Sequence, residues 1–182
     1  MANREALRQL QSRLAQRLQL ARSEPAAAGW LAVECAGQGL LVPLPSAGEI
    51  FSLTPLTAVP HTRAWFAGVA NLRGQLHGVV DLAAFLGLRP QALQFGPDAR
   101  RDSARLLALN PALGANCAVL VDRLAGLRSL AQLQPEPEPA QDGAASRPAF
   151  AGGVFRDEAG RRWQAIDLAA LARDEHFLGI AA

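Results

Sequence analysis

The sequence predicts a mainly β protein made of two similar small β modules, with an α-helix before them and short helices that begin at aspartates. Two observations support this fold class. Short apolar runs recur roughly every 8–12 residues with Gly and Pro between them, which is typical of small β barrels and not of a parallel sheet. A pattern of strand, turn, strand, Asp and helix also occurs twice, over residues 66–86 and 150–171, which indicates an internal repeat.

The first copy of the repeat is a hairpin followed by a helix. Residues 66–72 and 75–81 read as two strands joined at Arg73-Gly74. Gly74 can adopt the positive φ that a tight hairpin turn requires. Asp81 ends the second strand, so its carboxylate is placed to cap a helix over residues 82–86 by accepting backbone N–H bonds.

The second copy follows the same order. It begins at residues 150–154, turns near Gly160 and reaches Asp167 just before a helical stretch at 168–171. Asp167 is therefore predicted to be the second helix cap. Asp122 also follows an apolar run, and the same capping interpretation is the simplest one for it.

The N-terminal segment, residues 1–25, is predicted to be an amphipathic helix and a linker. Within residues 3–22 the apolar side chains repeat every three or four positions, which is the period of a helix. Residues 1–24 hold five Arg and two Glu, and Pro25 separates them from a domain at 26–182. The helix could pack on that domain, on a second copy of itself, or on acidic lipid or nucleic acid. It lacks the large aromatic anchors that favour a membrane surface.

Other strands and one long connection complete the expected order. Residues 30–35, 40–44, 105–110 and 117–124 read as strands. Residues 131–148 are rich in Pro, Glu and Ala and have almost nothing to bury, so they are predicted to be a mobile segment.

Composition limits the classes of partner. All 18 basic residues are Arg, the net charge is only +2, aromatics are 5% of residues and Tyr is absent. A dedicated nucleic-acid binder is expected to carry a larger basic excess, although a small nucleic-acid-binding barrel remains the alternative of a different class. No apolar run reaches the roughly 18 residues of a membrane helix, so direct membrane insertion is not expected. The two cysteines lie far apart in apolar runs and are predicted to be buried thiols of a cytoplasmic protein.

No catalytic, metal or cofactor motif is recognisable. His61, His77 and His176 show no metal-ligand spacing. There is no Ser in a nucleophile elbow and, without Lys, no phosphate-binding P-loop. The sequence therefore predicts a non-enzyme that binds no cofactor or metal and acts through its protein-binding surfaces.

One continuous motif carries a family resemblance. Residues 68–74 read G-V-A-N-L-R-G, and the next strand ends in V-V-D-L at residues 79–82. In this the chain resembles the CheW family of chemosensory adaptors. Glu49-Ile50 stands where that family has an E-I pair, residues 118–122 are similar to its G-L-x-V-D strand, and residues 150–171 are similar to its last module. The resemblance covers about residues 29–178.

The resemblance implies two five-stranded, SH3-like barrels packed together. It also implies a scaffold that links the cytoplasmic tip of a chemoreceptor to the regulatory domain of a CheA-type histidine kinase, peripheral to the membrane. Carried over residue by residue, the partner-binding positions are Asn71, Arg73 and Gly74, with Glu49 and Ile50 nearby. The Trp65 segment and the N-terminal helix are more similar to the pilus-type members that control twitching, and a flagellar or other signalling array is the alternative.

Overall fold

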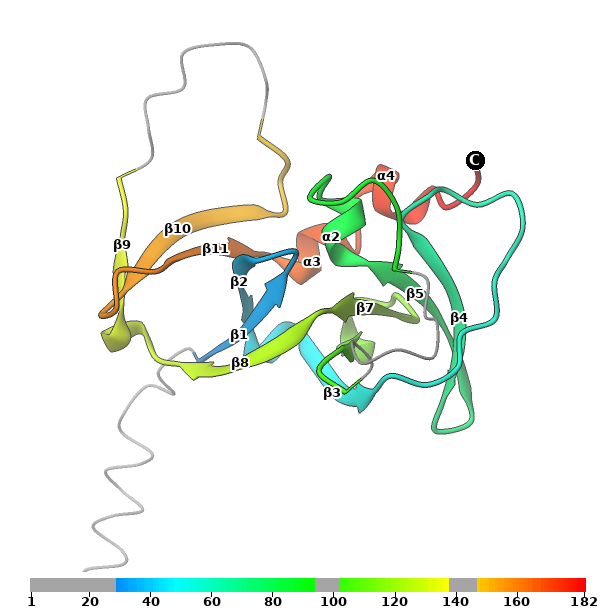
Figure 1. Ribbon diagram of the computed structural model, residues 1–182, viewed down its shortest axis with the longest axis horizontal. Helices are drawn as coiled ribbons and strands as arrows, with labels where there is room; N and C mark the ends of the chain where they lie inside the picture. The colour runs from blue at the N-terminus through cyan, green and yellow to red at the C-terminus, as the bar shows by residue number, and fades with distance from the viewer. Residues whose placement is uncertain (1–28, 94–101, 138–146) are drawn as a thin grey trace, which may run out of the picture.

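The computed structural model describes residues 29–93, 102–137 and 147–182. Within them the chain forms two β-sheets that lie side by side, joined by a few short helices (Figure 1). The predicted helix at 3–22, and with it the possible self-association through that helix, lies outside the described residues. The mainly β fold class is confirmed.

The five-stranded module holds the first copy of the repeat. Its sheet has the order β3-β6-β7-β5-β4. The strands are β3 (Ala47–Ser52), β4 (Phe66–Leu72), β5 (Gln75–Asp81), β6 (Arg105–Leu109) and β7 (Cys117–Val121). All neighbours are antiparallel except β5 and β7.

The six-stranded module combines the start of the described chain with its last third. Its sheet has the order β8-β1-β2-β11-β10-β9. The strands are β1 (Trp30–Cys35), β2 (Gln38–Pro43), β8 (Arg123–Arg128), β9 (Leu133–Pro135), β10 (Ala151–Asp157) and β11 (Arg162–Ile166). Here the one parallel pair is β11 with β2.

The internal repeat extends to the topology of both sheets. In each module the hairpin that ends at a cap aspartate lies on one side, and its second strand pairs in parallel with a strand from elsewhere in the chain. The outer edge of β10 pairs with β9, and the outer edge of β4 forms a single bridge between Thr57 and Val69. The prediction of two similar modules is confirmed, with β9 as an additional strand in one of them.

The buried apolar side chains form three clusters. One cluster lies inside each module, and a third, which we call the shared core, lies between the two modules. Leu31 and Val33 of β1 face the shared core, whereas Ala32 between them faces the interior of the six-stranded module. Strands buried on both faces read as continuous apolar runs, and this explains why the sequence shows runs where a half-exposed strand would alternate.

The short helices lie at the seam between the modules. They are α2 (Leu82–Phe85), α3 (Leu168–Leu171) and α4 (Glu175–Leu178). Phe85 of α2 makes edge-to-face contacts, at 5.3 Å between ring centroids, with Trp65 before β4 and with Phe177 of α4. The C-terminal segment thereby returns to the five-stranded module, where Thr62 pairs with Ala181.

The prediction of a mobile segment at 131–148 is wrong for its described first part. A 3-10 turn at Leu130–Gln132 leads into β9, and Leu133 is 5% exposed. Its side chain packs in the interior of the six-stranded module, and Glu136 pairs with Arg156 and Arg162. A single buried Leu and one carboxylate between two guanidiniums anchor a stretch whose composition alone suggests disorder. Residues 138–146 lie outside the described part.

Gly68 is expected to be intolerant of a side chain. Its φ is +125°, and a Cβ built there would lie 2.4 Å from the carbonyl oxygen of Thr57. Gly68→Ala should therefore disturb the Thr57–Val69 bridge and lower the free energy of unfolding by about 2 kcal/mol, as measured by urea denaturation. Gly37→Ala is the control, because Gly37 also has a positive φ but its Cβ would meet nothing within 4 Å. Equal losses in both variants would contradict the clash.

Candidate functional site

The β4–β5 turn holds Arg73 in an outward position. Arg73 and Gly74 both have positive φ, 51° and 82°, which are the signs that a two-residue type I′ turn requires. The side-chain oxygen of Asn71 accepts the N–H of Gly74 at 2.8 Å. Asn71 thus closes the turn, and the Arg73 side chain remains 76% exposed. The positive φ of Arg73 was not predicted, because only Gly74 carries a residue-type signal for it.

Glu49 lies against this turn from the opposite edge of the sheet. One of its carboxylate oxygens is 2.6 Å from Nη2 of Arg73. Because β3 and β4 are the two outer strands of the five-stranded sheet, the ion pair shows that the sheet is rolled upon itself. An exposed pair of this kind contributes little to stability, so the guanidinium can exchange its partner at small cost.

The structure brings together four of the five residues that the sequence predicts as the partner site, Glu49, Asn71, Arg73 and Gly74, and Ile50 follows Glu49 in β3. Ile50, next to Glu49, is 38% exposed despite its apolar side chain. Leu76, which pairs with Asn71 across the hairpin, is 63% exposed. Sequence reasoning missed Leu76, because an apolar residue between polar neighbours in a strand is expected to be buried. We name this surface, formed by Glu49, Ile50, Asn71, Arg73, Gly74 and Leu76, the hairpin surface.

The two cap aspartates have different surroundings. Asp167 accepts the N–H groups of Ala169 and Ala170 at the start of α3. Asp81 accepts the N–H of Ala84 at 3.1 Å at the start of α2, and its second oxygen accepts the N–H of Leu93 at 2.8 Å. Asp81 is fully buried, and burial raises its pKa above the usual range although these two bonds and Arg89 oppose the shift.

The interpretation of Asp122 as a helix cap is wrong. The chain continues from Asp122 into β8 and not into a helix. Its carboxylate instead accepts the N–H of Ala36 at 2.6 Å and lies 2.6 Å from Nη2 of Arg89. The residue therefore ties the crossover between the modules to the β1–β2 turn, an arrangement with no local sequence signal.

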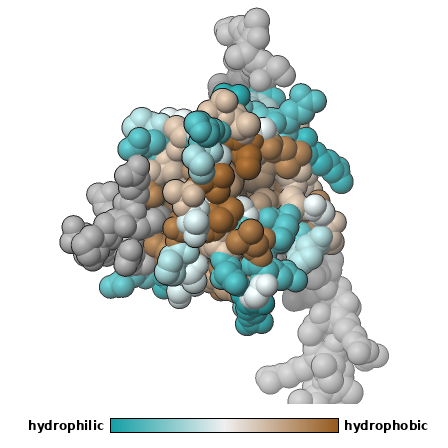
Figure 2. Space-filling view, turned by 90° about the vertical axis from the view of Figure 1, so that its right-hand side faces the viewer, coloured by the Kyte–Doolittle hydropathy of each residue, from teal (hydrophilic) through white to brown (hydrophobic). Residues whose placement is uncertain are grey.

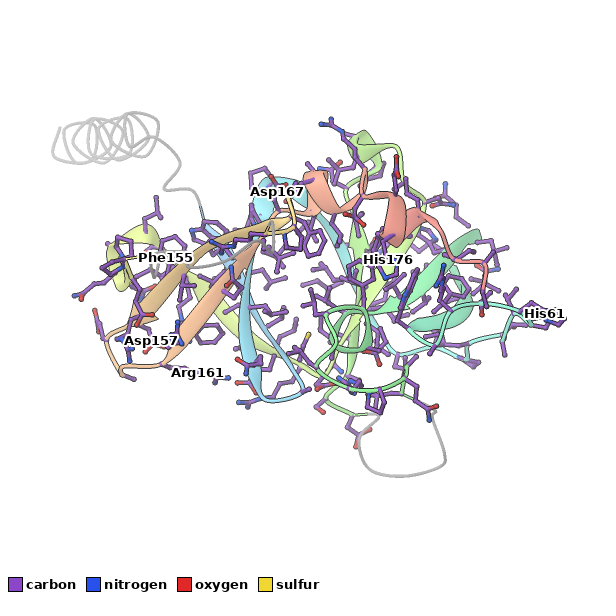
Figure 3. All side chains as sticks on the ribbon, turned by 90° about the horizontal axis from the view of Figure 1, so that it is seen from above. His61, Phe155, Asp157, Arg161, Asp167 and His176 are labelled. Atoms are coloured by element: carbon purple, nitrogen blue, oxygen red, sulfur yellow. The ribbon has the colours of Figure 1, made fainter. Side chains whose placement is uncertain are left out.

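A second charged cluster lies in the six-stranded module. Arg123 donates two hydrogen bonds to Glu34, at 2.5 and 2.6 Å, and Arg161 also pairs with this carboxylate. The Arg161 guanidinium lies 4.6 Å from the ring centroid of Trp163, and the Trp163 indole N–H donates to Asp157 at 2.8 Å. In Figure 3, Asp157 and Arg161 lie near the β10–β11 turn at one end of the molecule, with His61 at the other. The cluster connects four strands, β1, β8, β10 and β11, and forms no catalytic arrangement.

Glu34 is expected to make stability depend on pH. The hydrogen bonds from Arg123, aided by Arg161, hold its pKa below the ordinary value of 4.5 although burial opposes them. A carboxyl whose folded pKa is depressed adds stability that is complete above its unfolded pKa and is lost as the pH falls through the folded value. Urea midpoints should therefore fall below about pH 4.5, and Glu34→Gln should make this fall smaller. An unchanged acid limb in Glu34→Gln would contradict the assignment.

A hollow lies on the outer side of the five-stranded module. It has a volume of about 650 Å³, and polar and apolar groups contribute nearly equally to its surface. The apolar part includes Leu53, Leu56, Ala64, Phe66, Ala67 and Leu93, and the polar part includes Thr54, Arg63 and Gln91. Figure 2 shows this side of the molecule, where brown apolar atoms are framed by polar side chains. The hollow lies at the start of β4 and the hairpin surface follows its end, so the length of a strand separates them.

A second, mainly apolar groove of about 550 Å³ lies between the modules beside α2 and α4. It takes Leu40 and Ile166 from the six-stranded module, and Phe85 and Leu88 from the segment that follows β5. The hairpin surface contributes no residue to it. The groove and the hairpin surface are therefore separate features.

The remaining titratable groups suggest no reaction centre. Burial raises the pKa of the Cys117 thiol to about 11 and that of Cys35 further still, so neither is a ready nucleophile at neutral pH. The prediction of a buried thiol is confirmed for Cys35, whereas Cys117 is only partly buried. Among the described residues no three His, Cys, Asp or Glu side chains gather as a metal site would need. Within the same ranges no helix has the length and apolar character to cross a bilayer.

Comparisons with known proteins agree with this architecture. A model of the CheW-like domain matches residues 29–176. Protein PilI of Pseudomonas aeruginosa is 29% identical over 150 residues, which are 80% of this chain and 75% of PilI. The probable chemotaxis protein CheW of Rhizobium etli is 33% identical over 114 residues, 62% of this chain and 68% of that protein. The crystal structure of the scaffolding protein TtCheW from Thermoanaerobacter tengcongensis superposes with a TM-score of 0.58 at 19% identity, over 77% of this chain and 88% of that one.

Proposed function

Because this chain belongs to the family of CheW-like domains, we propose that it is a non-catalytic adaptor of a chemosensory array in the cytoplasm. In this function it holds a CheA-type histidine kinase at the cytoplasmic tip of a membrane-anchored chemoreceptor. The observation that carries the proposal is the hairpin surface. There the exposed guanidinium of Arg73, in the turn that Asn71 closes, pairs with Glu49. The same surface includes two exposed apolar side chains, Ile50 and Leu76.

The hairpin surface suits a receptor contact. Arg offers a planar fork of donors and is enriched among the residues that dominate protein interfaces. Arg73 is presented by a rigid two-residue turn, so little ordering is needed when a partner binds. Its present partner, Glu49, is an exposed carboxylate that a carboxylate or carbonyl of the receptor can replace.

An adaptor needs a second surface, and the hollow beside β4 suits the kinase. The resemblance implies that the kinase regulatory domain is itself CheW-like and that such domains meet barrel to barrel. Among the described residues the outer edge of β4 carries one bridge, to Thr57, and the hollow next to it combines apolar and polar groups. A small barrel whose end carries both apolar and polar side chains could cover this area while the hairpin surface holds the receptor.

Titration calorimetry of the full-length chain against the regulatory domain of the cognate CheA-type kinase tests the proposal. We expect saturable 1:1 binding that Ala64→Glu, in the hollow, weakens by about tenfold or more. Ala159→Glu is the matched control, since Ala159 is also exposed but lies on the β10–β11 turn. No binding at hundreds of micromolar, about 5 kcal/mol of affinity, would reject the kinase adaptor. Binding that both variants leave equal would move the contact away from the hollow.

The array is proposed to be of the type that controls type IV pili and twitching. The match to PilI spans 80% of this chain, against 62% for the Rhizobium etli CheW. The alternative is an adaptor of a flagellar chemotaxis or other signalling array. Deletion of the gene should abolish twitching and leave swimming intact, whereas the opposite pattern would favour the flagellar alternative.

A further inference from the structure

A chain of charges crosses the seam between the modules, from the buried Asp81 to Asp122, whose side chain is 31% exposed. Arg89 follows α2, and its side chain is 14% exposed. Its Nε lies 3.4 Å from Asp81 and its Nη2 lies 2.6 Å from Asp122. One guanidinium is thus shared by two carboxylates, and the buried thiol of Cys35 lies beside them.

Each end of this chain is anchored in a different module. Asp81 ends β5 of the five-stranded module and accepts the N–H groups of Ala84 and Leu93. Asp122 lies at the crossover into β8 and is held by the six-stranded module on two sides. Its carboxylate accepts the N–H of Ala36, and its own N–H donates to the carbonyl of Glu34 at 2.9 Å. Arg89 joins these two anchored carboxylates.

The shared core holds the modules together by contacts of a different kind. It contains many apolar side chains from both sheets, and apolar burial is strong but has no preferred direction. The hydrogen bond from Arg89 to Asp122 is charge-assisted and directional. The contact of Arg89 with Asp81 is an ion pair at 3.4 Å, which the burial of Asp81 strengthens. Removing these two contacts should leave the modules attached but less narrowly oriented.

We propose that Arg89 is a positioning residue and that Asp81, Arg89 and Asp122 form a latch that fixes the angle between the two modules. The latch is a property of the chain alone. Its part in signalling rests on the proposed function, since the adaptor would carry a receptor and a kinase whose spacing depends on this angle. Asp122→Asn is the sharpest perturbation. The Asn oxygen can still accept the N–H of Ala36, while the ion pair with Arg89 is lost and Asp81 keeps its cation.

Pulsed electron resonance on the full-length chain without partners tests the latch. Spin labels are placed at Gln75→Cys in the five-stranded module and at Glu158→Cys in the six-stranded one, in a Cys117→Ala background. Both labelled positions are exposed. We expect Asp122→Asn and Arg89→Met to shift or broaden the distance distribution, while circular dichroism and cooperative unfolding are retained. Asp102→Asn, an exposed carboxylate outside the latch, should leave the distribution unchanged.

The outcomes distinguish two roles for Arg89, a latch between the modules and a counterion for the buried Asp81. Unchanged distances in Asp122→Asn would overturn the proposal, because Arg89 would then only neutralise buried Asp81. If Arg89→Met does not fold, Asp122→Asn alone decides, since it leaves no buried carboxylate without its cation. A shift in Asp122→Asn without any kinase or receptor binding would support the latch and reject the proposed adaptor function, so the two failures are distinguishable.

Discussion

Charge reversal at Arg73 is expected to weaken binding of the chemoreceptor tip by about 30-fold, a loss of the size found at interface hot spots. Arg73→Glu removes the exposed guanidinium from the hairpin turn and places a second carboxylate beside Glu49. The ion pair contributes little to folding, so circular dichroism and the unfolding midpoint should change only slightly. The affinity is measured by titration calorimetry with a receptor fragment.

Two controls show whether Arg73 acts on the partner or on Glu49. Arg173→Glu reverses an exposed Arg between α3 and α4 and should leave the affinity unchanged. The exchange Glu49→Arg with Arg73→Glu restores an ion pair inside the chain. If Arg73 contacts the receptor, this exchange should not restore binding. Full restoration would mean that the pair only shapes the turn, and unchanged affinity in Arg73→Glu itself would remove Arg73 from the receptor contact.

Truncation of Trp163 is expected to cause the largest loss of stability, about 3–5 kcal/mol in Trp163→Ala. The indole is 1% exposed and fills the interior of the six-stranded module together with Leu41 and Leu133. Its removal leaves a cavity, takes the indole donor from Asp157, and removes the ring that Arg128 and Arg161 cover. The free energy of unfolding is measured by chemical denaturation with a fluorescence and a circular dichroism probe.

Trp163→Phe separates the volume of the ring from its hydrogen bond. Phe keeps most of the apolar volume but cannot donate to Asp157, so we expect a loss of about 1–2 kcal/mol. Similar losses in Trp163→Ala and Trp163→Phe would show that the hydrogen bond, and not cavity formation, dominates. A loss below 1 kcal/mol in Trp163→Ala would contradict the packing argument.

The sequence was most informative where neighbours in the chain decide the structure. The Arg73-Gly74 turn, the capping oxygens of Asp81 and Asp167 and the strands around them depend on contacts within a few residues. The repeat could be found for the same reason, because each copy is a local hairpin and helix. The capping prediction for Asp122 was wrong because it considered only near neighbours. Its position after an apolar run resembles that of a cap, but its partners come from distant segments.

Composition misled the prediction at residues 131–137. Pro, Glu and Ala are poor at forming a core, yet one Leu packed beside Trp163 and one Glu between two Arg were enough to order β9. The partners of this Leu and this Glu lie on β10 and β11, which come later in the chain. A prediction from the composition of residues 131–137 does not include these later partners, and so it missed the order of β9.

The sequence by itself determined that this protein is mainly β, that its hairpin unit occurs twice, and that Asn71, Arg73, Glu49 and Ile50 are the residues to examine. Only the tertiary structure decided that β1 and β2 complete the module of the second hairpin, that Glu49 meets Arg73 across a rolled sheet, and that Arg89 joins Asp81 to Asp122. The physical reason is the distance along the chain between the residues that interact. Turns and caps are made by hydrogen bonds between near neighbours, whereas sheet order and ion pairs between distant residues follow from how two modules bury their apolar faces against each other.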